Sequence, residues 1–163
     1  MANVFDLVKG DAHVVAESSR LKATTAGHIY DLKMAKDTDN GMIVSVGEHV
    51  EGQVFMAKDY VAGDKPYFIL TPPFAYNGKK SWSDEKYFYN AKDEIARAYE
   101  LHVDDIYTIS ADAFDGEPAV GKYVDAKYVV ADEAGASGFV GLITEEVNYT
   151  NSVSYRIRVV SLG

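Results

Sequence analysis

Short runs of apolar residues, separated by turns rich in Gly, Asp, Asn and Pro, make up most of this chain. The clearest example is 42–57, where apolar runs over 42–46 and 54–57 flank an acidic stretch that contains glycine. This order predicts a strand, a turn and a second strand. Asn40-Gly41 stands immediately before the first run. Because this dipeptide readily adopts positive φ at both residues, it predicts a tight turn between segments that can pair.

The rest of the chain contains further short runs of the same kind. Candidate strands fall at 5–8, 13–16, 67–70, 105–109, 120–124, 127–130, 139–143 and 154–160. The last of these alternates, with Tyr155, Ile157 and Val159 on one face and Arg156 and Arg158 on the other. Short strands at this spacing predict a mainly β fold, either a small β-barrel or a β-sandwich.

One segment has the signals of a helix. Asn90 is suited to the N-cap position, and Asp93 and Glu94 fall in the first turn, where the helix dipole favours acids. An apolar stripe at helical spacing follows, made of Ile95, Ala98, Tyr99 and Leu101. The sequence therefore predicts one short α-helix over about 90–101, packed on the sheet.

The first 35 residues are the least regular part of the chain. Two short apolar runs are followed by a polar stretch of small residues over 17–27. Chain ends that are not tied down are commonly mobile alone and can become ordered on contact with a partner. Residues 1–35 are thus either an N-terminal arm or peripheral strands of the main fold, and 36–163 are predicted to form a single β-rich domain.

A long connection over 74–90 is rich in aromatic residues, among them Tyr76, Trp82 and Tyr87. A loop of this length inside a compact domain either has a function or has its own structure. The aromatic side chains can anchor an interface or stack on a ligand, and they can equally form a small cluster that fixes the loop to the domain. Both interpretations remain open from the sequence.

Charge and composition exclude several classes of protein. The formal net charge is −9, which argues against a nucleic-acid-binding protein and against binding to an anionic membrane. The chain has no cysteine, so disulfides, thiol catalysis and cysteine-based zinc sites are excluded. It begins without the pattern of a signal peptide and has no apolar stretch of about 20 residues. We therefore expect it in a cytoplasm, or assembled there into something larger.

Residues with catalytic or metal-binding chemistry are scattered. The four histidines are His13, His28, His49 and His102, and no two have the spacing of ligands on one helix. They could bind a metal only if the fold gathered them, so no metal site is predicted. The acidic stretch 37–41 resembles a calcium loop but places Lys36 at the first ligand position and Gly47 at the twelfth.

Paired acids are the remaining candidates for catalysis. Asp104-Asp105 and Glu145-Glu146 are adjacent in sequence, and neighbours on a strand point to opposite faces, so neither doublet is itself a catalytic pair. Motifs for binding phosphate or dinucleotides are missing from the sequence. We therefore predict a protein that is not an enzyme, with no catalytic residue and no cofactor. An enzyme whose carboxylates are assembled by the fold is the least favoured alternative.

Several short motifs resemble the small β-rich capsid decoration (cement) proteins of tailed bacteriophages and prophages. These motifs are 42–47 (MIVSVG) after Asn40-Gly41, 52–55 (GQVF), 120–124 (VGKYV), 138–143 (GFVGLI) and 155–160 (YRIRVV). They fall within 36–60 and 118–161, about two-fifths of the chain. The resemblance implies a structural virion protein that binds the outside of a capsid and stabilises the shell. The implied partner is the major capsid protein, and the implied form on the capsid is a homo-oligomer.

The resemblance also suggests where such a protein makes contact. The N-terminal segment could add a strand to the edge of a capsid sheet, and its candidate contact residues are Phe5, Arg20, Leu21 and Lys22. Weak binding by each copy would be multiplied by its neighbours on the lattice. The alternative function is a carbohydrate- or ligand-binding β module that uses the aromatic loop 74–90.

Overall fold

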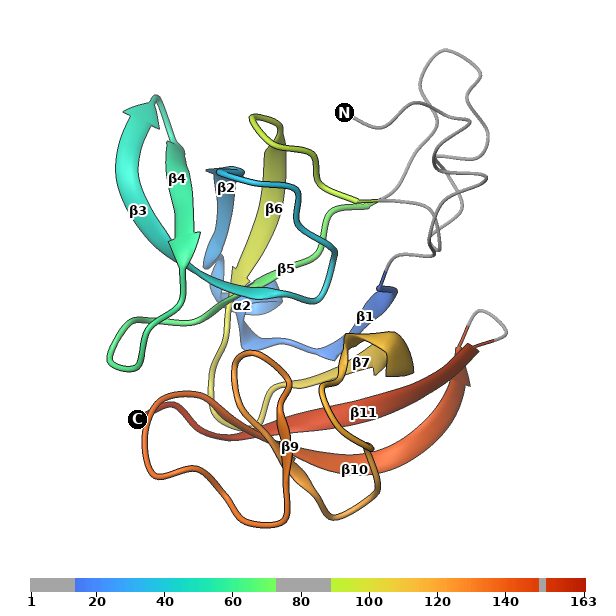
Figure 1. Cartoon of the computed structure of the whole chain (residues 1–163). Coiled ribbons are helices and arrows are strands. Elements are labelled where there is room, and N and C mark those ends of the chain that lie inside the picture. The colour runs from blue at the N-terminus through green and yellow to red at the C-terminus, as the bar shows by residue number, and fades with distance from the viewer. Residues whose placement is uncertain (1–13, 73–88, 150–151) are drawn as a thin grey trace.

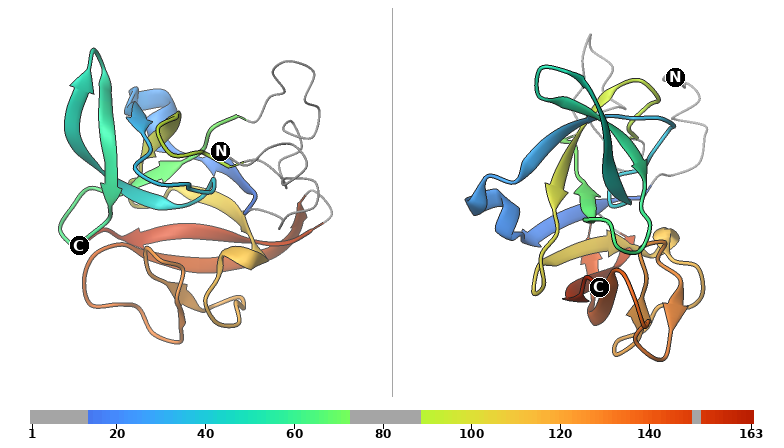
Figure 2. Two further views of the ribbon diagram at one scale, coloured as in Figure 1. Left: turned by 45° about the horizontal axis from the view of Figure 1, so that its top comes forward. Right: turned by 90° about the vertical axis from the view of Figure 1, so that its left-hand side faces the viewer.

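The computed structural model describes residues 14–72, 89–149 and 152–163, and these form a small β-barrel standing on a larger β-sheet (Figure 1). The further views show the same two layers, with the barrel above the sheet (Figure 2). The predicted mainly β fold is therefore confirmed, and it contains a closed barrel. No helix of the described residues is long and apolar enough to span a membrane.

The lower layer is a six-stranded sheet. In spatial order it contains β1 (Ala16–Arg20), β7 (Ile106–Ser110), β11 (Ser152–Ser161), β10 (Val140–Tyr149), β8 (Tyr123–Val124) and β9 (Val130–Ala131). All of its neighbouring strands are antiparallel. In β11, Tyr155, Ile157 and Val159 are buried, which confirms the predicted face of this strand.

The upper layer is the closed barrel. Its order is β2 (Ile29–Lys33), β4 (Val54–Asp59), β3 (Ile43–Glu51), β5 (Tyr67–Ile69) and β6 (Ile95–Glu100), with β2 pairing with both β4 and β6. The predicted strand–turn–strand unit is the β3–β4 hairpin, which turns at Gly52 with φ +51°. The regular helical turns among the described residues are α2 (Lys22–Ala26) and the 3₁₀ turn η3 (Ala111–Ala113).

The buried side chains form two groups. One fills the barrel and consists of Leu32, Met34, Ala57, Tyr67, Ile69, Ala96 and Ala98. The other lies between the barrel and the sheet, where Phe68 of β5 packs on Tyr107 of β7 with ring centroids 4.4 Å apart. Burying a side chain such as Phe68 stabilises a fold by about 1.5–3 kcal/mol. The shared cluster therefore fixes the barrel on the sheet.

The predicted helix over about 90–101 is wrong. Residues 95–100 form β6, which pairs with β2 on one side and β5 on the other. Burial follows the strand period of two, with Ala96, Ala98 and Glu100 buried and Ile95 and Arg97 exposed. Asp93 has φ +69°, which an α-helix does not allow. Barrel pairing satisfies the backbone of β6 on both edges, whereas an isolated three-turn helix is only marginally stable.

Asn40 and Gly41 form a turn, although the strands on either side of it do not pair with each other. The Asn40 side-chain amide bonds to the backbone of Thr71 in the way that a neighbouring strand would. It donates to the Thr71 carbonyl at 2.9 Å and accepts from the Thr71 N–H at 3.0 Å. It also accepts a hydrogen bond from the Asn90 amide at 3.1 Å. Asn90, which also bridges Thr38, therefore bonds to the segment before β3 and is not a helix cap.

Gly41 lies where the barrel meets the sheet. Its φ is +92°, and a Cβ atom at this position would lie 2.7 Å from Cδ1 of Ile109 in β7. Its carbonyl accepts a hydrogen bond from the buried hydroxyl of Tyr128, which also lies 3.0 Å from the hydroxyl of Tyr107. Only glycine combines this backbone conformation with so close an approach.

Candidate functional site

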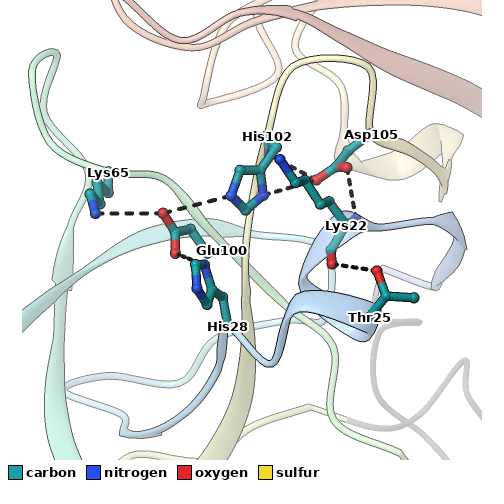
Figure 3. Close-up of polar contacts among 7 residues, drawn as sticks. All are labelled: Lys22, Thr25, His28, Lys65, Glu100, His102 and Asp105. Carbon is teal, nitrogen blue, oxygen red and sulfur yellow. Dashed lines mark hydrogen bonds and ion pairs between the residues drawn. The ribbon is translucent and has the colours of Figure 1, made fainter.

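The chain passes between sheet and barrel through two segments that lie against each other (Figure 3). All barrel strands fall between β1 and β7 in the sequence, so the chain leaves the sheet after β1 and returns to it before β7. The outgoing segment is 21–28, which contains α2, and the returning segment is 101–105. Five polar side chains gather here: His28, Lys65, Glu100, His102 and Asp105. We call this group the crossover cluster.

Asp105 ties the two crossing segments together. Its carboxylate accepts a hydrogen bond from the backbone N–H of Lys22 at 2.9 Å, at the start of α2. It accepts another from the backbone N–H of His102 at 2.8 Å. The side chain of Asp105 is buried, so these hydrogen bonds replace the water that the carboxylate gave up.

Glu100 and His28 face each other across two paired strands. Ile29 of β2 is opposite Tyr99 of β6, and the N–H of Glu100 donates to the carbonyl of His28 at 3.0 Å. This register brings Nδ1 of His28 to 2.8 Å from Oε2 of Glu100. The Glu100 side chain is only 12% exposed, whereas that of His28 is 51% exposed. The carboxylate is thus held in the wall, and the imidazole borders solvent.

His102 stands between the two buried carboxylates. Its Nε2 lies 3.9 Å from Oε1 of Glu100, and its Nδ1 lies 3.9 Å from Oδ2 of Asp105. Neither distance is a hydrogen bond, and Nδ1 is buried without a hydrogen-bond partner. The rings of His102 and His28 are neighbours, with centroids 5.8 Å apart. The lysine Lys65 also lies beside Glu100, with its Nζ 3.6 Å from Oε1.

The crossover cluster has two chemical capacities. As a network of polar contacts, it joins the two segments that connect barrel and sheet. As a set of donors, His28, Glu100 and His102 offer two imidazole nitrogens and a carboxylate oxygen that all lie within 4.8 Å of one another. Two histidines and one carboxylate are a common ligand set for transition-metal ions.

The sequence did not indicate this cluster, because His28 and Glu100 are far apart along the chain. One partial signal was present: Glu100 and His102 are two residues apart, a spacing that places side chains on one face of an extended segment. The interpretation of 90–101 as a helix concealed that signal, since residues two apart on a helix do not face each other.

The candidate contact residues of the N-terminal segment occupy different environments. Arg20 ends β1 and is exposed, and the Lys22 side chain at the start of α2 is exposed as well. Leu21 is buried in the core between barrel and sheet, so it stabilises the fold and is not available for contact. Phe5 lies outside the described residues.

The aromatic-loop candidates Tyr76, Trp82 and Tyr87 also lie outside the described residues. A cleft of about 730 Å³ lies next to the end of this loop. Its lining includes Tyr89, Tyr60 and charged residues from both layers, among them Asp59 and Lys127. The cleft therefore offers aromatic and charged groups on the surface shared by the barrel and the segment before β9.

Comparisons with known protein families, curated proteins and solved structures found no match for this chain.

Proposed function

We propose that this chain is a structural protein that binds the outer surface of a tailed-phage capsid and stabilises the shell. The resemblance of its Gly- and Val-rich motifs to capsid decoration proteins supports this proposal. The structural observation that carries it is the edge strand β1, which pairs with β7 on one side and with no other described strand. An edge of this kind can receive a strand from a partner.

The outer edge of β1 has polar, exposed residues from Glu17 to Arg20. The carbonyl of Val15 accepts a hydrogen bond from Ser110, so the alternation of an antiparallel pair directs the backbone of Glu17 toward β7 and that of Ser18 away from it. A hollow of about 630 Å³, lined by Ser18, Arg20 and Val103, lies beside the strand. Ser18 is therefore the position where an added strand would take backbone hydrogen bonds.

The net charge of the chain and the binding of many copies to one shell also support a role in capsid decoration. The net charge of −9 favours a partner surface that carries positive charge and keeps free copies apart. A single added strand is a weak contact, but copies bound next to each other on a lattice gain a high effective concentration. Binding across the joints between capsid subunits would oppose the outward pressure of packaged DNA.

Co-sedimentation with undecorated tailed-phage shells tests this proposal. We expect the full chain to pellet with the shells and Ser18→Pro to lose binding, because proline has no N–H to donate outward. Ser18→Ala is the matched control, since it keeps the N–H and should bind like the original chain. The proposal would be contradicted if the unsubstituted chain failed to bind shells that lack their own decoration protein. Equal binding by the unsubstituted chain, Ser18→Pro and Ser18→Ala would also contradict it.

The cleft beside Tyr89 favours a second candidate, a ligand-binding β module. Aromatic faces next to charged groups are suited to sugars and other polar ligands. Glycan-array binding that is lost with Trp82→Ala and weakened with Lys127→Ala would support this function. Lack of any glycan binding by the full chain would retire it.

A further inference from the structure

We propose that His28, Glu100 and His102 form a binding site for a divalent transition-metal ion, with Zn²⁺ as the ion that best fits this ligand set. The proposal is independent of the capsid function, because it depends only on the crossover cluster. Nothing in the spacing of the four histidines along the sequence predicts it.

Distances between the donor atoms carry the argument. Nδ1 of His28 and Oε2 of Glu100 are 2.8 Å apart, and Nε2 of His102 is 3.9 Å from Oε1 of Glu100. Tetrahedral zinc with bonds of about 2.0–2.1 Å needs ligand atoms about 3.3–3.4 Å apart. The two distances lie on either side of that value and involve the two different oxygens of Glu100, while one donor atom from each of the three residues lies within 4.8 Å of the others. Binding of one ion by all three residues therefore requires side-chain rotations that draw the two imidazoles toward the Glu100 carboxylate.

The surroundings of His102 are those of a metal ligand. A ligating histidine usually gives its second ring N–H to a carboxylate, which fixes the orientation of the ring. Nδ1 of His102 is buried without a hydrogen bond, and Oδ2 of Asp105 lies 3.9 Å away. Asp105 is itself held by two backbone N–H groups. When Nε2 binds the ion, a slight turn of the ring provides Nδ1–H with this acceptor.

The solvent access and the neighbouring charges of the crossover cluster are also compatible with a bound metal ion. The 51% exposed side chain of His28 leaves one side of the site open, so a water molecule can take the fourth position on the ion. Lys65 is the competing cation, with Nζ 3.6 Å from Oε1 of Glu100. Its side chain is 76% exposed, so its ammonium group can move into solvent when the ion binds.

A bound ion would join the two segments that connect barrel and sheet. His28 ends the outgoing segment, and His102 belongs to the returning segment, while Glu100 ends β6. An ion that binds only the folded chain raises stability in proportion to the logarithm of its concentration above Kd. The site would thus strengthen the joint between the two layers.

Calorimetric titration of the full chain with Zn²⁺ tests the site. We expect one ion per chain, with affinity reduced at least about tenfold in His28→Ala and in His102→Ala. His49→Ala is the matched control, because His49 is an exposed barrel histidine outside the cluster. We expect this variant to bind Zn²⁺ with unchanged affinity. Circular dichroism of each variant checks that the fold is kept.

Lys65→Ala provides the second measurement. Removing the competing ammonium group should tighten Zn²⁺ binding, which a surface binding of zinc to scattered histidines would not show. The proposal is overturned if the original chain binds no Zn²⁺ in the titration. It is equally overturned if His28→Ala and His102→Ala bind Zn²⁺ as tightly as His49→Ala.

Discussion

The phenolic hydroxyl of Tyr128 donates a hydrogen bond to the carbonyl of Gly41, and this bond joins the loop before β9 to the barrel at a fully buried position. Because Tyr128 has a single hydroxyl proton and uses it on Gly41, the hydroxyl of Tyr107 is the donor to Tyr128 at 3.0 Å. Tyr107 is in β7, so three distant parts of the chain meet in one directed chain of hydrogen bonds.

The direction of these hydrogen bonds predicts unequal effects of two similar substitutions. Tyr128→Phe leaves both the Gly41 carbonyl and the Tyr107 hydroxyl without a partner, at about 1–3 kcal/mol for each buried group. Tyr107→Phe removes only a donor and leaves the Tyr128–Gly41 bond in place. We expect Tyr128→Phe to lower the free energy of unfolding more than Tyr107→Phe in urea titrations. Equal losses would contradict the assigned direction.

The same tyrosines predict that the protein loses stability in alkali. Burial raises the pKa of Tyr107 and of Tyr128 above the value near 10 of a free tyrosine. Above about pH 10 the unfolded chain releases these protons while the folded chain keeps them. The contribution of these two tyrosines to stability is therefore constant below about pH 10 and falls above it, by up to about 1.4 kcal/mol per pH unit for each tyrosine.

Urea titrations across this pH range measure the effect. The double variant Tyr107→Phe/Tyr128→Phe is less stable at neutral pH but should show a shallower alkaline decline, because two of the protons are gone. If the unfolding free energy of the double variant fell as steeply with pH as that of the unsubstituted chain, titratable groups other than Tyr107 and Tyr128 would be responsible.

Gly41→Ala tests the close approach between barrel and sheet. The new Cβ would meet Cδ1 of Ile109 at 2.7 Å, in addition to the strain of φ +92°. Gly121 has the same φ with nothing within 4 Å, so Gly121→Ala carries the backbone strain alone. We expect Gly41→Ala to lower the free energy of unfolding by about 1–3 kcal/mol more than Gly121→Ala. Equal losses of unfolding free energy in the two variants, measured by thermal or urea unfolding, would mean that the Ile109 side chain moves aside at no cost.

Asp105→Asn tests the connection between the crossing segments. An amide keeps one acceptor oxygen but turns its NH₂ group toward one of the two backbone N–H donors, so we expect a loss of about 1–3 kcal/mol. Asp104→Asn is the matched control, because this neighbour is exposed and only 3.8 Å from Arg158 in a surface ion pair worth about 0–1 kcal/mol. Unfolding of both variants in urea would measure the difference.

The sequence predicted the parts of the fold that depend on local pattern. The β3–β4 hairpin was visible as two apolar runs around a turn that contains glycine, and β11 as an alternation that buries Tyr155, Ile157 and Val159 in one core. Strand β6 could not be predicted in this way, because its segment IARAYE contains good helix formers. Its burial at every second residue results from pairing with β2 and β5. Tertiary pairing here overrides local propensity.

The crossover cluster could not be predicted for a related reason. His28 and Glu100 become neighbours only through the β2–β6 register, and Asp105 reaches Lys22 only because both crossing segments run together. The burial of the candidate contact residues was equally hidden from the sequence. Arg20 and Lys22 are exposed, whereas Leu21 is buried because the barrel and the sheet enclose it.

Electron cryomicroscopy of undecorated tailed-phage shells mixed with this chain is the most direct test of its proposed function. We expect density for the barrel and sheet on the outside of the shell, with the outer edge of β1 paired to a capsid strand at Ser18. Shells without added density, or density attached through the cleft beside Tyr89 with β1 facing solvent, would contradict it.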